Sequence, residues 1–266
     1  IGRQGSIGEG TKTPGGYGMG IYLNPGNDGF AEAIRSEIYV DKTGFIREWW
    51  ENQDAVTLIA RPRRFGKTLN MSMLERFFSV EYKGQGKIFE GLSIWNNKTY
   101  QELQGTYPVI ALSFADVKEV TFPAAREKIG QIIKMVFGKY RFLLDSDVLA
   151  EDEKDDFRKI SADLENSAIT LSLKKLSLYL SRYYGKKVII LLDEYDTPIQ
   201  EAYINGYWDE MTAFIRSLFN STFKTNPYLF RAVMTGITRI SKESVFSDLN
   251  NLAVITTTSE IYEDSF

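Results

Sequence analysis

The 266-residue sequence contains no cysteine and no histidine. Without cysteine, the chain can form no disulfide, thiolate metal site or cysteine nucleophile, and it carries no redox evidence for a cellular compartment. Without histidine, a Ser-His-Asp triad and a histidine-ligated zinc site are excluded. These two absences remove several common kinds of active site.

Long hydrophobic runs and a strong net charge are also absent. The longest purely aliphatic run covers residues 188–192, whereas a membrane-spanning helix needs about 20 apolar residues. The net charge is −3, so no global basic field draws the chain to nucleic acid, and such a contact requires a local patch. No signal peptide is recognisable, so we expect a cytoplasmic protein that does not engage a membrane.

Composition and length are those of an ordinary globular chain. Hydrophobic residues make up 43% of it and charged residues 25%, and its length corresponds to one large domain or two smaller ones. Residues 1–18 are rich in glycine and poor in apolar side chains, which is typical of a flexible linker or a cloning remnant. Met19 is a candidate native start, and we expect the folded domain over residues 19–266.

One stretch carries the first motif. Val56–Ala60 is an apolar, strand-like run, residues 61–65 form a short basic loop, and Gly66-Lys67-Thr68 opens a segment predicted to be helical over residues 69–80. Unpaired backbone N–H groups at a helix start can donate to a phosphate. In loops of this kind the lysine contacts the β- and γ-phosphates, and the threonine hydroxyl ligates Mg²⁺. The motif therefore predicts a nucleotide phosphate site.

The loop departs from the usual pattern G-x-x-x-x-G-K-[ST] at its first position, which is Arg61. A glycine there lets the chain leave the strand with a positive φ, which costs other residues about 1–2 kcal/mol. Arg61-Pro62 favours extended backbone instead, because a residue before proline avoids the helical region. We expect Arg61, Arg63 and Arg64 to supply anion affinity. The alternative is a basic loop at a helix start that binds no ligand.

Apolar runs alternate with helical patterns along the rest of the chain. Residues 36–46 are predicted to form a short extended piece that runs into a helix ending near residue 52. Further strands are predicted at residues 107–114, 187–192 and 229–234, with a candidate fifth at 253–257. Further helices are predicted at 123–140, at 168–184 and around Trp208–Phe219. We expect a turn-rich loop at residues 20–30 and a polar, turn-rich stretch with scattered aromatic residues at 81–105. The acidic residues 145–156 are expected to form a solvated helical insertion, not a metal site. The alternation predicts an α/β fold with a mostly parallel sheet covered by helices on both faces.

Ligands of open α/β sheets bind beyond the carboxyl ends of the strands, so the residues that follow the strands are informative. Asp193 and Glu194 follow the run 187–192. We expect Asp193 to polarise water around Mg²⁺ and Glu194 to orient and deprotonate the attacking water. Asp196 is an alternative for either role, and an acidic loop start without function is the simpler interpretation.

The predicted fourth strand ends at Thr235-Gly236 and is followed by Thr238 and Arg239. A polar or cationic side chain at this place is suited to lie near the γ-phosphate and to report its hydrolysis. The alternative is an ordinary surface arginine after a strand. We expect the three groups after the first, third and fourth strands to converge on one nucleotide.

Five blocks of the sequence together resemble the bacterial AAA-ATPase-like family, which belongs to the P-loop NTPases with an extra catalytic glutamate. These blocks are IYLNPGNDGFAEA, SEIYVDKTGFI, RPRRFGKTLNMSML, VIILLDEYDTPI and TGITRISKESVFSDLNNL, and they follow the family's order from Met19 to Phe266. Arginine is common at the first loop position in this family, so Arg61 does not argue against activity. The resemblance implies a five-stranded sheet of 51432 order and the binding of ATP with Mg²⁺.

The resemblance also implies roles for single residues. Thr68 and Asp193 are expected to hold Mg²⁺, and Lys67, Glu194 and Arg239 to act in hydrolysis. The segment around Tyr39 and Asp41 is similar to one that often lines the base pocket in related NTPases. The nucleotide-binding residues implied in this way are Tyr39, Asp41, Arg61, Pro62, Arg63, Arg64, Phe65, Gly66, Lys67, Thr68 and Leu69.

Relatives in this family commonly continue into a PD-(D/E)XK nuclease-like domain, so the chain is expected to be truncated at its C-terminus relative to the family. The tripeptide Asp152-Glu153-Lys154 has the nuclease pattern, but it lies in a charged segment without an apolar strand around it. Nucleic acid is therefore an expected partner only through a domain outside this sequence, and a homo-oligomer is a further expectation, because a neighbouring subunit can supply an arginine finger.

Two other functions stay open at this point. The chain could be a nucleotide-binding module without turnover, which Arg61 and the lack of an identifiable arginine finger would suit. Alternatively, Arg61, Arg63, Arg64 and Lys67 could bind a nucleic-acid backbone, with an affinity that falls steeply in salt. The second alternative explains neither Thr68 nor Asp193-Glu194.

Overall fold

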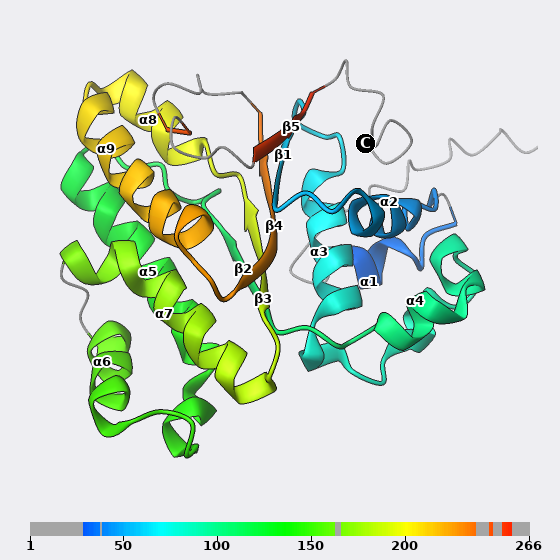
Figure 1. The fold of residues 1–266 in the computed structure, drawn as a ribbon. Coiled ribbons are helices and arrows are strands. Elements are labelled where there is room, and N and C mark those ends of the chain that lie inside the picture. Colours follow the sequence, from blue (N-terminus) through cyan, green and yellow to red (C-terminus); the bar gives the residue numbers. More distant parts are fainter. Residues whose placement is uncertain (1–28, 38, 163–165, 238–244, 247–251, 257–266) are drawn as a thin grey trace, which may run out of the picture.

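Five parallel strands form one sheet at the centre of the chain (Figure 1). The strands are β1 (Val56–Ala60), β2 (Val109–Ser113), β3 (Val188–Asp193), β4 (Leu229–Gly236) and β5 (Leu252–Ile255). Their order across the sheet is β2-β3-β4-β1-β5, which confirms the predicted 51432 arrangement read from the β5 edge. The structure is a computed structural model that describes residues 29–37, 39–162, 166–237, 245–246 and 252–256.

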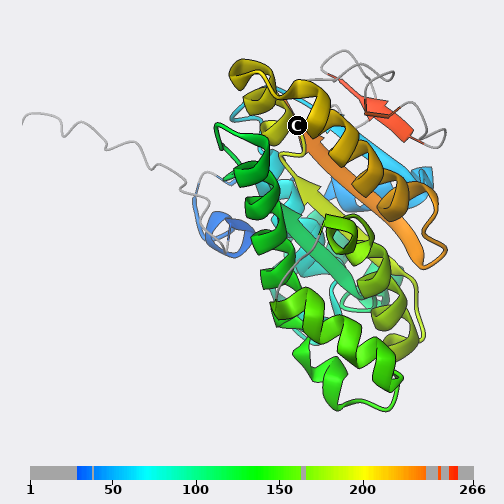
Figure 2. The same ribbon diagram turned by 90° about the vertical axis from the view of Figure 1, so that its left-hand side faces the viewer.

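Helices cover both faces of the sheet, as predicted (Figures 1 and 2). One face carries α1 (Gly29–Ala33), α2 (Gly44–Asn52), α3 (Lys67–Phe78) and α4 (Lys98–Leu103). The other face carries α5 (Phe122–Lys139), α6 (Glu151–Ala162), α7 (Asn166–Tyr184), α8 (Thr197–Asn205) and α9 (Trp208–Phe219). Short single turns connect these helices: η1 (Val80–Tyr82), η2 (Gly86–Phe89), η3 (Ser93–Asn96), η4 (Arg141–Asp145) and the π-turn η5 (Asn220–Lys224).

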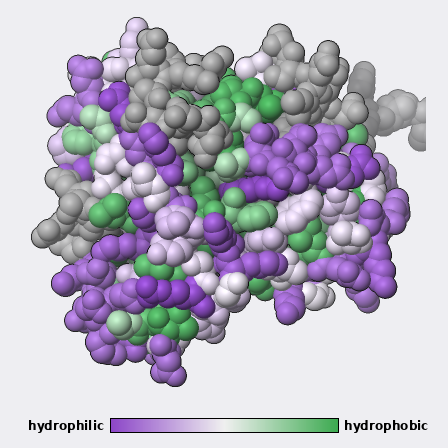
Figure 3. Space-filling model, in the orientation of Figure 1, coloured by the Kyte–Doolittle hydropathy of each residue, from purple (hydrophilic) through white to green (hydrophobic). Residues whose placement is uncertain are grey.

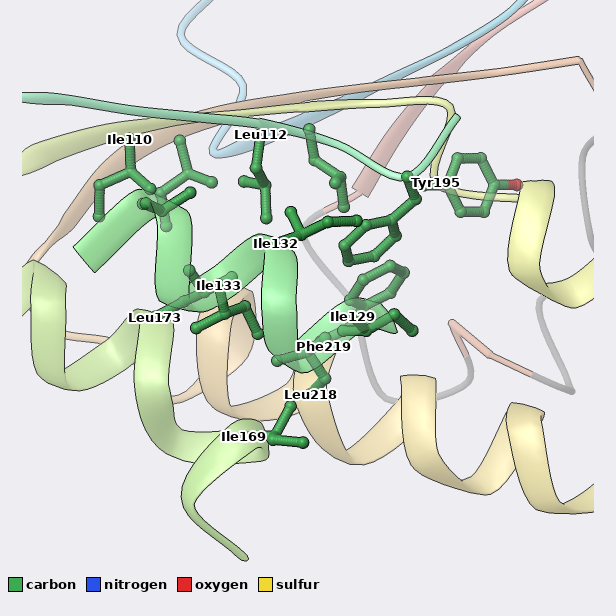
Figure 4. Packing of buried hydrophobic residues seen from close by; sticks show 14 of the residues in the cluster. Ile110, Leu112, Ile129, Ile132, Ile133, Ile169, Leu173, Tyr195, Leu218 and Phe219 are labelled. Carbon is green, nitrogen blue, oxygen red and sulfur yellow. The ribbon is translucent and has the colours of Figure 1, made fainter. Parts of the chain in front are cut away.

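A separate hydrophobic core lies on each face of the sheet, because successive strand residues point to opposite sides. In β1, for example, Leu58 belongs to the core under α5, α7 and α9, and Ile59 to the core under α3. Figure 4 shows the first core, where Ile110 and Leu112 of β2 lie against the isoleucines of α5. The strands are therefore buried on both faces, which explains their near-continuous apolar sequences.

The second core is aromatic and depends on a region that the sequence analysis described only as polar and turn-rich. Residues 81–105 form three single turns and α4. Phe89 stacks on Trp95 with ring centroids 5.8 Å apart, and it also stacks on Phe30 of α1 at 5.2 Å. The scattered aromatic residues of this region are thus core residues, and the prediction of an irregular polar loop was incomplete.

Element boundaries differ from the predicted ones by a few residues, and some short elements were missed. Helix α3 begins at Lys67 and ends at Phe78, two residues earlier at each end than predicted. The sequence analysis did not predict α1, α4 or α8, which are 5, 6 and 9 residues long. In the part of residues 36–43 that the structure describes, turns and irregular backbone take the place of the expected extended piece.

The hydropathy of the surface follows the arrangement of the sheet and the helices. Figure 3 shows hydrophilic residues over both flanks of one face, with hydrophobic residues gathered in the middle where the sheet lies between the helical layers. The acidic segment 145–156 is α-helical only from Glu151, where α6 begins, and Lys154 pairs with Glu151 there at 3.1 Å. None of the described helices is long and apolar enough to cross a membrane. Residues 1–28, which include the suggested linker and Met19, lie outside the described part.

Candidate phosphate-binding site

The loop between β1 and α3 has the backbone conformation of an anion-binding concavity. Arg64 and Gly66 both have positive φ values, 71° and 72°, and Phe65 between them does not. Alternation of this kind turns successive N–H groups toward one point, where they attract an anion. Gly66 is also the N-cap of α3, so the first turn of the helix adds unpaired N–H groups at the same place. The side chains of Arg63, Arg64 and Phe65 are exposed around this point.

Lys67 places its ammonium inside the loop. Its Nζ donates to the carbonyl of Arg61 at 2.9 Å and to the carbonyl of Pro62 at 2.8 Å, and the residue is only 7% exposed. An ammonium has three donors, so one remains for a ligand. Burial is the main influence and lowers the pKa of Lys67, while the charges of Asp193, Glu194 and Asp196 act in the opposite direction. Nearby carboxylates thus favour the charged form that phosphate binding needs.

Asp193 connects the ends of three elements. It is the last residue of β3, and its Oδ2 accepts a hydrogen bond of 2.7 Å from the hydroxyl of Thr68 at the start of α3. Its Oδ1 accepts a hydrogen bond from the hydroxyl of Thr235 in the neighbouring strand β4. Asp193 is buried and Thr68 is exposed, so the carboxylate lies beneath the surface and the threonine at it.

The next residue, Glu194, has an unusual backbone. Its φ is 51°, in the left-handed region, which costs a residue with a side chain about 1–2 kcal/mol. Thr235 holds this conformation from two sides: its hydroxyl accepts from the N–H of Glu194 at 3.2 Å, and its carbonyl accepts from the N–H of Tyr195 at 2.9 Å. Strain of this kind clusters at functional sites because the surrounding structure must maintain it. The carboxylate of Glu194 accepts from the hydroxyl of Thr197 at 3.2 Å.

Asp196 lies deeper and joins β4 to α8. Its Oδ2 accepts from the N–H of Ile237 at 2.9 Å and from the side-chain amide of Gln200 at 2.7 Å. These contacts fix the start of α8 beside the end of β4. One oxygen of Asp196 is thus engaged by α8 and the residue after β4, and its predicted alternative role at the ligand stays a prediction.

The segment containing Tyr39 and Asp41 makes contacts within its own layer of helices. Asp41 accepts from the backbone and hydroxyl of Thr43, at 2.8 and 2.6 Å, and from the backbone N–H of Ser93 at 2.7 Å. Burial alone would raise the pKa of Asp41, but these hydrogen bonds outweigh it and lower the pKa. Tyr39 packs edge-on against Phe30, and burial raises its pKa to about 12. Asp41 thus joins the start of α2 to η3, and its predicted contact with a base stays a prediction.

The structure brings most of the other predicted residues to one edge of the sheet. Residues 61–68, Asp193, Glu194 and Thr235 all lie at or just beyond the carboxyl ends of β1, β3 and β4. Leu69 is half-buried and packs against the aromatic core. Thr238 and Arg239 fall outside the described residues. The sequence analysis missed Thr197, whose position directly after Asp196 at the start of α8 was a usable signal.

The oxygen atoms at this place suit a magnesium ion. Mg²⁺ prefers hard oxygen ligands and usually takes only one or two side chains, completing its shell with water and phosphate oxygens. The hydroxyl of Thr68 and the carboxylate of Asp193 are within hydrogen-bond distance of each other. Nowhere in the described residues do three acidic side chains form a metal-binding cluster, so a metal here would depend on phosphate ligands.

The fold and the site together define a class. A five-stranded parallel sheet in 51432 order, with a Gly-Lys-Thr loop after β1 and an acidic tip on β3, is the arrangement of P-loop NTPases. The chain belongs to the AAA-ATPase_like family, described as "Predicted AAA-ATPase", whose model matches residues 26–246.

One curated relative is much longer than the region that it shares with this chain. The chain is 27% identical over 215 residues to a protein of Azotobacter chroococcum mcd 1 named "Uncharacterized protein in vnfD 5'region". The match covers 80% of this chain but only 36% of that protein, so the chain spans little more than a third of its relative's length. No solved structure matches the chain.

Proposed function

We propose that this chain binds ATP with Mg²⁺ at residues 61–69 and hydrolyses it. The observation that carries the proposal is the bridge formed by Asp193 between Thr68 and Thr235. It joins the phosphate loop, the acidic strand tip and the end of β4 into one polar centre. Its residue types are those that Mg²⁺-dependent phosphoryl transfer requires. The family supports a nucleotide as ligand.

Each residue of the centre has a proposed role. Lys67 uses its remaining donor on the β- and γ-phosphates, and the backbone N–H groups of the loop surround them. Thr68 and Asp193 would hold Mg²⁺, which would neutralise charge on the phosphates. Glu194 orients and deprotonates the attacking water, while Thr235 and Arg239 respond to the state of the γ-phosphate.

We further propose that turnover drives a conformational switch that is coupled to a partner domain. The lengths support this, because the related Azotobacter protein is much longer than the region that it shares with this chain. A nuclease-like domain is the proposed partner, and any nucleic acid would be contacted through it. A second copy of the chain is the proposed source of an arginine finger.

Two substitutions test this function. Lys67→Ala is expected to abolish ATP binding, and Glu194→Gln is expected to bind ATP normally but to turn it over about 10²–10⁴-fold more slowly. Lys98→Ala and Glu102→Gln are matched controls, because these side chains are 86% and 70% exposed on α4, outside the proposed site. Equal turnover by the wild type and Glu194→Gln would refute the role of Glu194. ATP binding by the wild type without any phosphate release would instead support a nucleotide-binding module without turnover.

The exposed arginines of the loop favour one second candidate, which is binding of a nucleic-acid backbone. Arg63 and Arg64 are both exposed and flank the concavity. Such binding would weaken steeply with salt. Competition between ATP and a DNA duplex for the protein separates the two functions, because only a shared surface makes ATP displace the DNA.

A further inference from the structure

The side chain of Arg61 is buried without compensation. The residue is only 5% exposed, and within the described part of the chain neither its Nε nor its Nη2 has a hydrogen-bond partner. A guanidinium cannot lose its proton in a protein, so burial leaves it charged. Buried charges are normally paired, because removing them from water costs several kcal/mol even after relaxation. Arg61 therefore has two buried donors that no described residue satisfies.

The other buried arginine of the described residues, Arg231, shows how this chain treats such a group when the role is structural. Its Nη1 donates to the carbonyls of Trp49 and Trp50, at 3.0 and 2.7 Å, in the last turn of α2. Its guanidinium also lies over the rings of Trp50 and Phe230, at 5.2 and 5.0 Å. Carbonyls and aromatic faces thus contact the guanidinium of Arg231, whereas Nε and Nη2 of Arg61 have no hydrogen-bond partner.

The backbone fixes Arg61 beside the phosphate loop. Its N–H donates to the carbonyl of Gly236 at 3.1 Å, which continues the ladder between β1 and β4 by one residue. Its carbonyl accepts from Nζ of Lys67 at 2.9 Å. Because side chains alternate along a strand, Arg61 continues the series of Thr57 and Ile59, on the face that α3 covers. These contacts hold the backbone of Arg61 at the end of β1, and its side chain is buried there.

We propose that Arg61 is a phosphate-binding residue whose buried charge is neutralised only when an anionic ligand occupies the loop. The inference rests on the proposed nucleotide site and adds a residue with a double effect. In the free protein the unpaired guanidinium destabilises the fold, and in the complex it donates to phosphate oxygens. A glycine at the first loop position would let the backbone come close to the phosphates. Arginine at this position supplies a charged side chain instead, and it makes the stability of the fold depend on the bound ligand.

The test compares Arg61→Met with the same substitution at two other arginines. Methionine keeps the length of the side chain and removes the charge. We expect the melting temperature of unliganded Arg61→Met to rise by about 2–8 °C, because an apolar residue replaces an unpaired buried ion. The same variant should bind pyrophosphate about 10-fold or more weakly than the wild type, since charge-assisted hydrogen bonds are lost. Arg231→Met should melt lower, and the exposed Arg63→Met should melt unchanged.

Arg61→Lys is a second variant that separates the effect of the charge from the effect of the side-chain shape. Arg61→Lys retains the charge, so its unliganded melting temperature should not rise, and pyrophosphate should still stabilise it. A fall in the unliganded melting temperature of Arg61→Met with unchanged pyrophosphate affinity would show a structural role and overturn the proposal. Failure of the ATPase proposal appears differently: ATP would then not bind the wild type, or Lys67→Ala would bind it normally, whatever Arg61→Met does with pyrophosphate.

Discussion

Gly236, the last residue of β4, has no room for a side chain. A Cβ atom built there would lie 2.5 Å from Cε1 of Tyr195 and 2.8 Å from Oδ1 of Asp196. These distances are shorter than real Cβ contacts, and both neighbours are fully buried, so neither can move into solvent. The backbone φ of Gly236 is not in the left-handed region, so the constraint is purely steric. Gly236→Ala must therefore displace the turn that begins at Asp193.

The size of the effect follows from this geometry. Overpacking of a well-packed core by one methyl group costs about 1–3 kcal/mol. For a domain of this size, each kcal/mol corresponds to about 2–4 °C, so the melting temperature should fall by roughly 2–12 °C. The displacement also reaches the site, because Thr235 holds the N–H groups of Glu194 and Tyr195. We therefore expect slower ATP turnover as well.

Thermal and urea denaturation measure the first effect, and a phosphate-release assay measures the second. Gly138→Ala is the matched control: a Cβ there has nothing within 4 Å, and the residue lies inside α5. Alanine is better than glycine inside a helix by about 0.5–1 kcal/mol, so this variant should be slightly more stable. If Gly236→Ala unfolds like the wild type while Gly138→Ala gains stability, the steric argument is wrong.

Three further predictions concern other charged groups. Arg231→Met should lower the free energy of unfolding by about 2–3 kcal/mol in urea titrations, because the carbonyls of Trp49 and Trp50 lose a charged donor; an unchanged value would contradict this. Burial raises the pKa of Glu75 above its ordinary value of 4.5, because it favours the neutral carboxyl group. The contribution of Glu75 to the free energy of unfolding is therefore fully present below pH 4.5 and is lost as the pH rises through the folded-state pKa. Glu75→Gln should accordingly melt higher than the wild type at pH 8 but not at pH 4, and equal differences at both pH values would refute it. Burial lowers the pKa of Lys67 below the ordinary lysine value of 10.5. As the pH rises, the affinity for ATP measured by calorimetry should therefore begin to fall before pH 10.5 is reached, because Lys67 loses its charge. An affinity that stays constant up to pH 10.5 would count against a charged Lys67 in binding.

The strands and the polar residues at their ends were predictable because their signals are local. A strand buried on both faces is mostly apolar, and β1, β3 and β4 show such runs apart from Thr57, Arg231 and the polar residues at their ends. Gly66-Lys67-Thr68 and Asp193-Glu194 could then be predicted as site residues, because they come shortly after these apolar runs. The strand order of the family then places these strands in one parallel sheet. The carboxyl ends of parallel strands lie at the same edge, so the polar residues beyond them are expected to lie close together.

Other features depend on contacts between distant residues. The aromatic residues of residues 81–105 pack against α1, α2 and α3, so their role was not visible in a polar, turn-rich sequence. Asp41 resembled a base-pocket residue in sequence, but its partner Ser93 lies 52 residues away. The short helices α1, α4 and α8 lack the length that makes helical periodicity recognisable.

The basic loop after β1 shows both sides of this division. Its sequence by itself predicted a phosphate-binding type of loop, because Gly-Lys-Thr at a helix start after a strand has the groups that such a loop needs. Only the tertiary structure decided that Thr68 and Thr235 share Asp193, and that Arg61 is buried while Arg63 and Arg64 are exposed. Burial and pairing are set by neighbours from other strands and helices, which a local sequence does not contain.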